Sequence, residues 1–299
     1  MADVLPTRPF GAVLAAMVTP FTADGGLDLD AAQALAAHLV ERGHDGLVIS
    51  GTTGEAPTTT DAEKEALLRA VVEAVGDRAR IVAGVGTNDT AHSVELAQQA
   101  DKAGAHGLLA VTPYYNKPPA EGIRAHFTAV ADATDLPLML YDIPGRSAVR
   151  IGTPNLLRLA EHPRIVAVKE ATGDLFAGSV VMAATDLAYY SGDDALNLAW
   201  LAHGAAGAVS VVSHVAGLEY AQMVRAVDEG DLVTARQVHA RLIPAVTGLM
   251  TRTQGAITTK AALQLLGVLP NREMRLPLVR ATDAEVDQLR ADLAESGLL

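Results

Sequence analysis

The chain has 299 residues, 49% of them of apolar type, which is enough to bury the core of one large α/β domain. Its formal net charge of −12 repels phosphate backbones and anionic lipid, which argues against nucleic-acid and membrane partners. The lack of cysteine excludes disulfides, thiolate metal sites and cysteine nucleophiles. Because the sequence shows neither a basic-then-apolar leader nor a run near the ~18 apolar residues of a spanning helix, we predict a soluble, cytoplasmic protein.

Eight short apolar runs recur along the chain, separated by 19 to 34 residues. Several are rich in β-branched residues and do not alternate with polar ones, as in Leu47-Val48-Ile49 and Ile165-Val166-Ala167-Val168. Runs of this kind are typical of strands buried on both faces of a parallel sheet. The predicted strands begin at Val13, Leu47, Ile81, Gly107, Pro137, Ile165, Ala188 and Gly207.

The stretches between these runs carry helical patterns. The clearest is Asp61 to Val75, where apolar residues share one face and Thr60 and Glu63 have the spacing of a capping box. Residues 28–42 and 90–103 show the same periodicity and end at glycines. Alternating strands and helices indicate a parallel sheet with helical crossovers.

Eight strand–helix units predict a closed (β/α)8 TIM barrel over residues 1–230, with an open doubly wound sheet as the alternative. After residue 230 the strand-like runs stop, and residues 231–250, 258–266 and 283–296 read as helices. We therefore predict a C-terminal helical domain over residues 231–299.

Active groups of such a barrel lie at the carboxyl ends of its strands. Four predicted strand ends carry reactive side chains. In the segment from Gly51 to Glu55, two glycines allow a tight turn whose hydroxyls and N–H groups can bind a carboxylate, although an ordinary βα loop has the same composition. Tyrosines at the rim of a barrel also commonly serve packing. The four segments are Gly51-Thr52-Thr53-Gly54-Glu55, Thr112-Pro113-Tyr114-Tyr115-Asn116, Tyr141-Asp142-Ile143-Pro144-Gly145-Arg146 and Lys169-Glu170.

Lys169 is the strongest single candidate for chemistry. It ends an apolar strand, and burial lowers the pKa of an ammonium, which supplies the neutral amine that attacks a carbonyl. Tyr141 ends the preceding strand, from where its phenol can pass protons to and from a carbinolamine. The alternative is a solvated lysine paired with Glu170.

Other reaction types find less support in the sequence. Gly84-Val85-Gly86 lacks the third glycine of a dinucleotide fingerprint, so we predict no cofactor. The nine histidines include no i, i+4 pair, so we predict no metal centre. We interpret Asp193-Asp194 as an N-cap for the following helix. Glu55 and Glu170 could form the acid pair of a glycosidase, but nothing else supports that reading.

The four strand-end motifs resemble those of the dihydrodipicolinate synthase and N-acetylneuraminate lyase superfamily. They occur in the same order at the matching strands, and the resemblance covers the whole chain, including its C-terminal helices. Within the superfamily the chain is most similar to the dihydrodipicolinate synthase branch. Members of that branch condense pyruvate with L-aspartate 4-semialdehyde in the diaminopimelate route to lysine.

The resemblance implies catalytic roles for four residues. Lys169 forms the Schiff base with pyruvate, and Tyr141 donates and accepts protons. Thr52 links Tyr141 to Tyr115 in a hydroxyl relay, in which Tyr115 comes from the neighbouring subunit. A shared tyrosine requires at least a dimer, and the family suggests a homotetramer built as a dimer of dimers.

Four further residues are implied to bind substrate. Thr53 holds the pyruvate carboxylate, with Gly192 and the backbone at Val209 beside it, and Arg146 receives the carboxylate of the aldehyde. A guanidinium binds a carboxylate bidentately, which suits a short acidic aldehyde. Sialic-acid lyases usually lack this arginine and carry Ser-Thr in place of Thr-Thr in the Gly-rich loop. The alternatives are an aldolase for sugar acids and a non-catalytic barrel that binds a small acid.

Inhibited members of the family bind lysine at a dimer interface beside the relay tyrosines. This chain keeps Tyr114 and Asn88 of that region, but it departs elsewhere, since Ala56 and Pro57 follow the Gly-rich loop. Inhibited bacterial members tend to carry histidines where this chain has Asp61 and Lys64, and a glutamate where it has His92. Losing that acid and gaining a lysine disfavours a cationic ligand. We therefore predict weak or absent inhibition by lysine.

Overall fold

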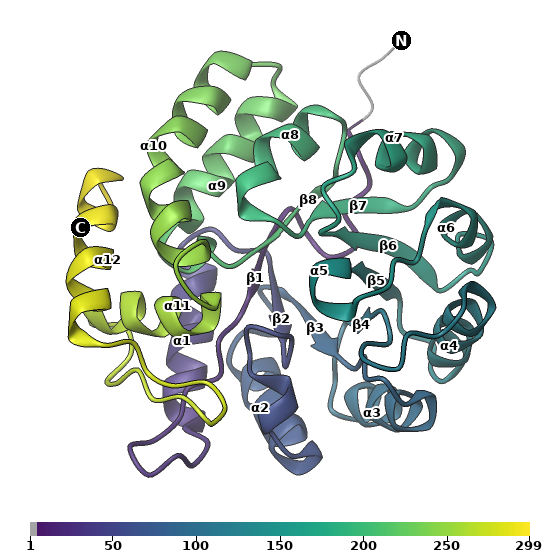
Figure 1. Cartoon of the computed structure of the whole chain (residues 1–299), viewed down its shortest axis with the longest axis horizontal. Helices are drawn as coiled ribbons and strands as arrows, with labels where there is room; N and C mark the ends of the chain where they lie inside the picture. The colour runs from purple at the N-terminus through teal and green to yellow at the C-terminus, as the bar shows by residue number, and fades with distance from the viewer. Residues whose placement is uncertain (1–4) are drawn as a thin grey trace.

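A computed structural model describes residues 5–299. Eight parallel strands pair in sequence order, and β8 pairs back with β1, which closes the barrel (Figure 1). The predicted (β/α)8 barrel is thus confirmed, and the alternative of an open sheet is wrong. The strands are β1 (Val13–Ala16), β2 (Gly46–Ile49), β3 (Arg80–Gly84), β4 (Gly107–Val111), β5 (Leu138–Asp142), β6 (Ile165–Glu170), β7 (Ala188–Ser191) and β8 (Gly207–Ser210).

The helices surround the barrel as an outer layer (Figure 1). All eight strands begin within one residue of their predicted starts, and α2 spans the predicted residues, with the capping box of Thr60 and Glu63 formed. The helices are α1 (Leu29–Glu41), η1 (Ala56–Thr58), α2 (Asp61–Val75), α3 (Thr90–Lys102), α4 (Ala120–Asp132), α5 (Pro144–Ser147), α6 (Thr153–Leu159), α7 (Leu175–Ala184), η2 (Asp194–Leu196), α8 (Asn197–Ala202), α9 (Ser213–Asp228), α10 (Leu232–Met250), α11 (Gly255–Leu265) and α12 (Asp283–Glu295).

The strands bury side chains on both faces, as their non-alternating sequences require. One apolar cluster fills the barrel interior and a larger one lies between the strands and the helices. Phe10 fills the amino-terminal end of the barrel, where Gly46 and Gly107 begin their strands. A Cβ at Gly107 would lie 2.3 Å from Phe10 Cε1, so the close approach requires glycine. Packing therefore closes this end and leaves the chemistry to the other.

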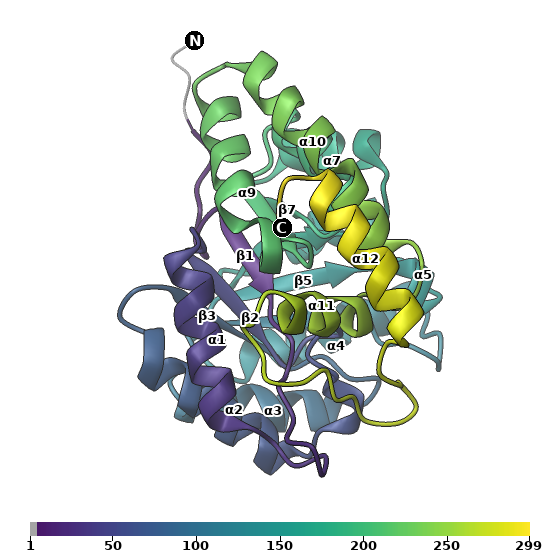
Figure 2. The ribbon, with the colours of Figure 1, turned by 90° about the vertical axis from the view of Figure 1, so that its left-hand side faces the viewer.

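Helices α10 and α11 pack on α9, and α12 packs on α10 and α11, on the side of the barrel near α1 (Figures 1 and 2). A separate apolar cluster joins them to α9 and β1. This cluster contains residues from both sides of position 230. The division into a barrel domain and a helical domain at that position stays a prediction. Within residues 5–299, no helix combines the length and the apolarity needed to cross a membrane.

Candidate active site

A cavity of about 440 Å³ opens at the carboxyl ends of the strands. Ala16, the last residue of β1, and Val111, the last of β4, form part of its wall. Thr52, Tyr141, Arg146 and Lys169 also line it, so four of the eight residues predicted to catalyse the reaction or to bind substrate share one cavity. The other four, described below, lie around it or away from it.

Lys169 and Tyr141 lie side by side on β6 and β5, where they are register partners. The Lys169 Nζ lies 4.3 Å from the centre of the Tyr141 ring. Burial lowers the pKa of Lys169 to about 8, which the negative charge of Asp194 opposes. Burial also raises the pKa of Tyr141 to about 12, against the positive charge of Arg146. The site therefore holds an amine that is easily made neutral next to a phenol that keeps its proton.

Asp142 and Glu170 follow Tyr141 and Lys169 in the two strands, so they point to the opposite face of the sheet. Glu170 Oε1 accepts a hydrogen bond from the Thr172 N–H at 2.8 Å. The alternative pairing of Lys169 with Glu170 does not occur, and Lys169 is only 5% exposed. The alternation of the strand thus separates the amine from the nearest acid in sequence.

Asp193 and Asp194 do different jobs, which corrects their joint interpretation as a helix cap. Asp193 caps η2, accepting from the Ala195 N–H at 3.0 Å. Asp194 is buried and accepts from the N–H groups of Val211 and Val212 at 2.9 and 3.0 Å, just after β8. It therefore braces the end of the neighbouring strand and places a negative charge near the amine.

The Gly-rich loop after β2 places Thr52 in the cavity wall, while Thr53 is buried beside it and does not line the cavity. Arg146 lies on α5, a short helix that directly follows β5, and its side chain is exposed at the rim. Its positive charge acts on both Lys169 and Tyr141. A guanidinium at this place faces any anionic group that enters the cavity.

Gly192 and Val209 do not line the cavity. A Cβ at Gly192 would lie 2.9 Å from Lys169 Cγ, so the missing side chain leaves room for the lysine. Val209, in the middle of β8, belongs to the same interior cluster as Tyr141. Gly192 therefore lies against Lys169, and Val209 belongs to the core that contains Tyr141.

Tyr114 and Tyr115 point in different directions. Tyr114 lines the cavity, whereas Tyr115 does not and is 87% exposed. The Tyr115 backbone has a φ of +72°, a left-handed conformation that residues other than glycine rarely adopt. With this backbone conformation the phenol lies in solvent, outside the cavity of its own barrel.

Gly84 and Gly86, whose spacing resembles part of a dinucleotide fingerprint, also line the cavity. A Cβ at Gly84 would lie 2.4 Å from the Ser50 carbonyl oxygen, and one at Gly86 would lie 2.3 Å from the Val111 nitrogen. They allow neighbouring strand ends to approach closely, which paired glycines after a strand can indicate. Among residues 5–299, no cluster of three or more His, Asp or Glu side chains is arranged to hold a metal ion.

Comparisons with known proteins agree along the whole chain. The dihydrodipicolinate synthetase family matches residues 9–296. A 4-hydroxy-tetrahydrodipicolinate synthase of Kineococcus radiotolerans is 69% identical over 98% of this chain and 95% of its own length. The 4-hydroxy-tetrahydrodipicolinate synthase 2 of Streptomyces coelicolor is 63% identical over 98% and 97%. A crystal structure of the Cyanidioschyzon merolae enzyme with lysine bound superposes with a TM-score of 0.94 at 44% identity, covering 98% of this chain and all of that one.

Proposed function

The chain belongs to the dihydrodipicolinate synthetase family, and we propose that it acts as a 4-hydroxy-tetrahydrodipicolinate synthase, a lyase of the class I aldolase type. Its substrates are pyruvate and L-aspartate 4-semialdehyde. The observation that carries the proposal is the buried Lys169–Tyr141 pair, with Arg146 at the rim of the same cavity. Nucleophile, proton carrier and anion-binding group thus share one site.

The chemistry starts at the amine of Lys169. Its neutral form attacks the ketone carbon of pyruvate, and the carbinolamine loses water to give an imine. Tyr141 supplies a proton to the departing hydroxyl and later takes one up, so that the methyl carbon becomes an enamine nucleophile. The enamine then attacks the aldehyde carbon of the second substrate, whose carboxylate binds Arg146. Thr52 and Tyr115 connect the phenol to solvent, and Thr53, Gly192 and Val209 surround the pyruvate carboxylate.

The exposure of Tyr115 supports assembly of the site between subunits. The exposed phenol does not line its own cavity, and it can instead complete the relay of a neighbour. We propose a homotetramer built as a dimer of dimers, located in the cytoplasm with the rest of amino-acid biosynthesis.

A panel of aldehydes tests the choice of second substrate. With pyruvate present, aspartate 4-semialdehyde should be consumed faster than neutral aldehydes and sugars, because only an acidic aldehyde can pair with Arg146. Arg146→Ala should raise the KM for aspartate semialdehyde by about tenfold or more, with a smaller effect on neutral aldehydes. Preferred condensation of pyruvate with a sugar by the unaltered enzyme would favour the alternative of a sugar-acid aldolase.

The region matched to the family's lysine site borders the same cavity, and Asp61, Lys64 and His92 all contribute to its wall. The Asp61 carboxylate already contacts His92 Nε2 at 2.9 Å and Lys64 Nζ at 3.6 Å. Asp61 is thus not available as a replacement for the missing glutamate. The Cyanidioschyzon merolae relative was solved with lysine bound, so lysine is a ligand of at least that member of the family.

Turnover of the unaltered enzyme should change little with L-lysine up to millimolar concentration at constant ionic strength. The ammonium of the ligand would meet Lys64 without a free acid to pair with it. His92→Glu should introduce saturable inhibition, whereas His92→Gln, the matched control without a charge, should not. Sub-millimolar inhibition of the unaltered enzyme would contradict this expectation.

A further inference from the structure

A buried ion pair ties the Gly-rich loop, residues 51–55, to the C-terminal helices. Lys260 Nζ on α11 donates to Glu55 Oε1 at 2.6 Å, and both side chains are 1% exposed. Lys260 also donates to the Glu273 carbonyl at 2.7 Å and lies 4.1 Å from the centre of the Phe21 ring. Two ions buried at this depth need good geometry and additional hydrogen bonds to offset their desolvation, so the pair defines one position for the loop.

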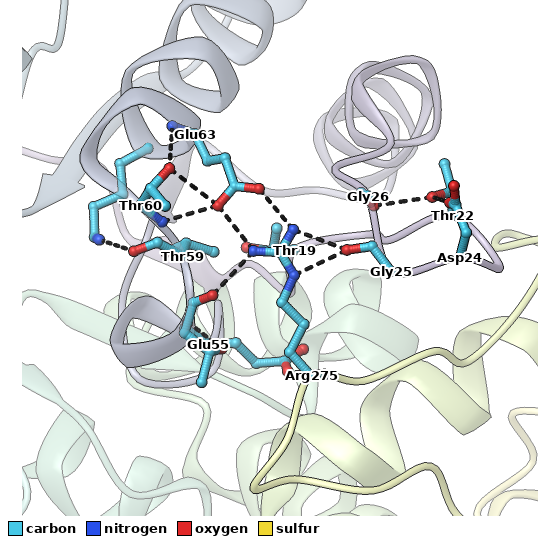
Figure 3. Close-up of polar contacts among 12 residues, drawn as sticks. Thr19, Thr22, Asp24, Gly25, Gly26, Glu55, Thr59, Thr60, Glu63 and Arg275 are labelled. Atoms are coloured by element: carbon cyan, nitrogen blue, oxygen red, sulfur yellow. Dashed lines mark hydrogen bonds and ion pairs between the residues drawn. The ribbon is translucent and has the colours of Figure 1, made fainter.

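Arg275 makes a second tie, which Figure 3 shows. Its backbone N–H donates to Glu55 Oε2 at 3.0 Å, and its guanidinium binds both carboxylate oxygens of Glu63 at 2.6 and 2.8 Å. The same guanidinium donates to the carbonyls of Gly25 and Thr58. One side chain therefore joins the turn before α1, the end of η1 and the first turn of α2.

These ties meet at the segment that directly follows Thr52 and Thr53. Glu55 has a φ of +55°, a left-handed conformation that a residue with a side chain keeps only when its surroundings hold it. The preceding carbonyl, of Gly54, accepts from the Thr19 hydroxyl at 2.7 Å. The loop is thus held at two successive residues, and Thr52 projects from it into the cavity wall.

We propose that Glu55, Lys260 and Arg275 are positioning residues, which hold Thr52 and Thr53 in place for the reaction of pyruvate. The inference rests on the proposed function. None of the three side chains lines the cavity, so the C-terminal segment would act on the site through the loop. Loosening the loop by a fraction of an ångström should weaken pyruvate binding and slow imine formation, because reaction rates are sensitive to such displacements.

Arg272 provides a matched control on the same segment. Its side chain is as buried as that of Arg275, at 19% against 20% exposed, and it too has a carboxylate partner, Asp283. Its other contacts are the Gln264 side chain and the Ala281 carbonyl, so all three lie within the C-terminal segment. Losing Arg272 should therefore disturb the segment without releasing the catalytic loop.

The experiment compares Arg275→Ala with Arg272→Ala in the full-length chain. For each variant we measure how the yield of borohydride-trapped adduct depends on pyruvate concentration. We also measure kcat per trappable site, the KM for pyruvate, and Tm. Arg275→Ala should raise the half-saturating pyruvate concentration about tenfold and lower kcat/KM by about 10 to 100-fold. Arg272→Ala should lower Tm and leave both pyruvate constants within about twofold of the unaltered enzyme.

Equal pyruvate constants for the two variants, with only Tm reduced, would overturn the positioning role. If Arg275→Ala does not fold, the double variant Glu55→Gln, Lys260→Met replaces it under the same criterion. Removing both charges together avoids leaving one ion buried alone. An unaltered enzyme that forms no pyruvate adduct would instead refute the proposed function, so the two failures can be distinguished.

Discussion

Replacement of Lys169 by arginine is expected to lower pyruvate-dependent turnover by about 10³-fold or more. A guanidinium stays protonated at every pH at which the protein is folded, so it keeps the charge but cannot attack a carbonyl. Borohydride added with pyruvate should leave the mass of a reduced pyruvate adduct on the peptide that carries Lys169. The variant should retain its fold and form no adduct.

Lys64 is the control for this experiment, because it lies in the same cavity and is largely buried. Lys64→Arg should still form the adduct at Lys169. An adduct on Lys64, or full turnover by an enzyme that cannot be trapped, would show that the Schiff base is assigned to the wrong amine. Buried Lys260 is already bound to Glu55 and should stay unmodified.

The pH dependence of adduct formation follows from the same side chain. Because burial favours the neutral form, the pKa of Lys169 falls to about 8, and about a tenth of the amine is neutral at pH 7. An ordinary lysine would have about one neutral amine in three thousand. The rate of trapping in the free enzyme should therefore rise about tenfold per pH unit below 8 and level off above it. A rate that continues to rise to pH 10 would mean that the amine is solvated.

Most of the fold could be predicted because its signals are local. Each strand is a short run of mainly apolar residues, and α2 begins with its own capping box, so neither depends on distant residues. The same topology explains why Lys169 and Tyr141 could be predicted as neighbours. Consecutive parallel strands place their carboxyl ends on one rim, and register then aligns the two residues.

The contacts that could not be predicted join parts of the chain that only the closed barrel brings together. Asp194 reads as part of a helix cap, but its partners follow β8, which lies beside β7 in space. The partners of Glu55 could not be predicted, because Lys260 lies 205 residues away in the sequence and Arg275 lies 220 residues away. These contacts form because α11 and the segment after it pack beside the loop. The local sequence pattern around Glu55 carries no information about that packing.

Tyr115 shows a different limit. The resemblance predicts that it belongs to a relay, yet the single chain leaves the phenol exposed and outside the cavity that Tyr141 lines. The resemblance alone supplies the neighbouring subunit. Pairing between subunits leaves no local pattern in the sequence, because the partner residues lie on another copy of the chain.

Tyr115 and Tyr141 are expected to act as one relay, so their losses should not multiply. Each Tyr→Phe change removes a hydroxyl from a single proton path and should lower kcat by about 10²-fold. The double variant should be little slower than the slower single variant. Fully multiplicative losses, measured in steady-state kinetics per trappable site, would mean that the two phenols do separate jobs.

Mixing the two single variants tests whether the relay crosses between subunits. In a hybrid dimer of Tyr115→Phe and Tyr141→Phe chains, the subunit that keeps Tyr141 receives an intact Tyr115 from its partner. One site of each hybrid is then complete, so the mixture should regain turnover that neither variant has alone. If both phenols acted within one chain, no hybrid site would be complete and mixing would restore nothing. Subunits must be exchanged before the assay. A mixture of Lys169→Arg and Tyr141→Phe chains serves as the control. Both of these changes affect residues that a subunit supplies to its own site, so no hybrid site is complete.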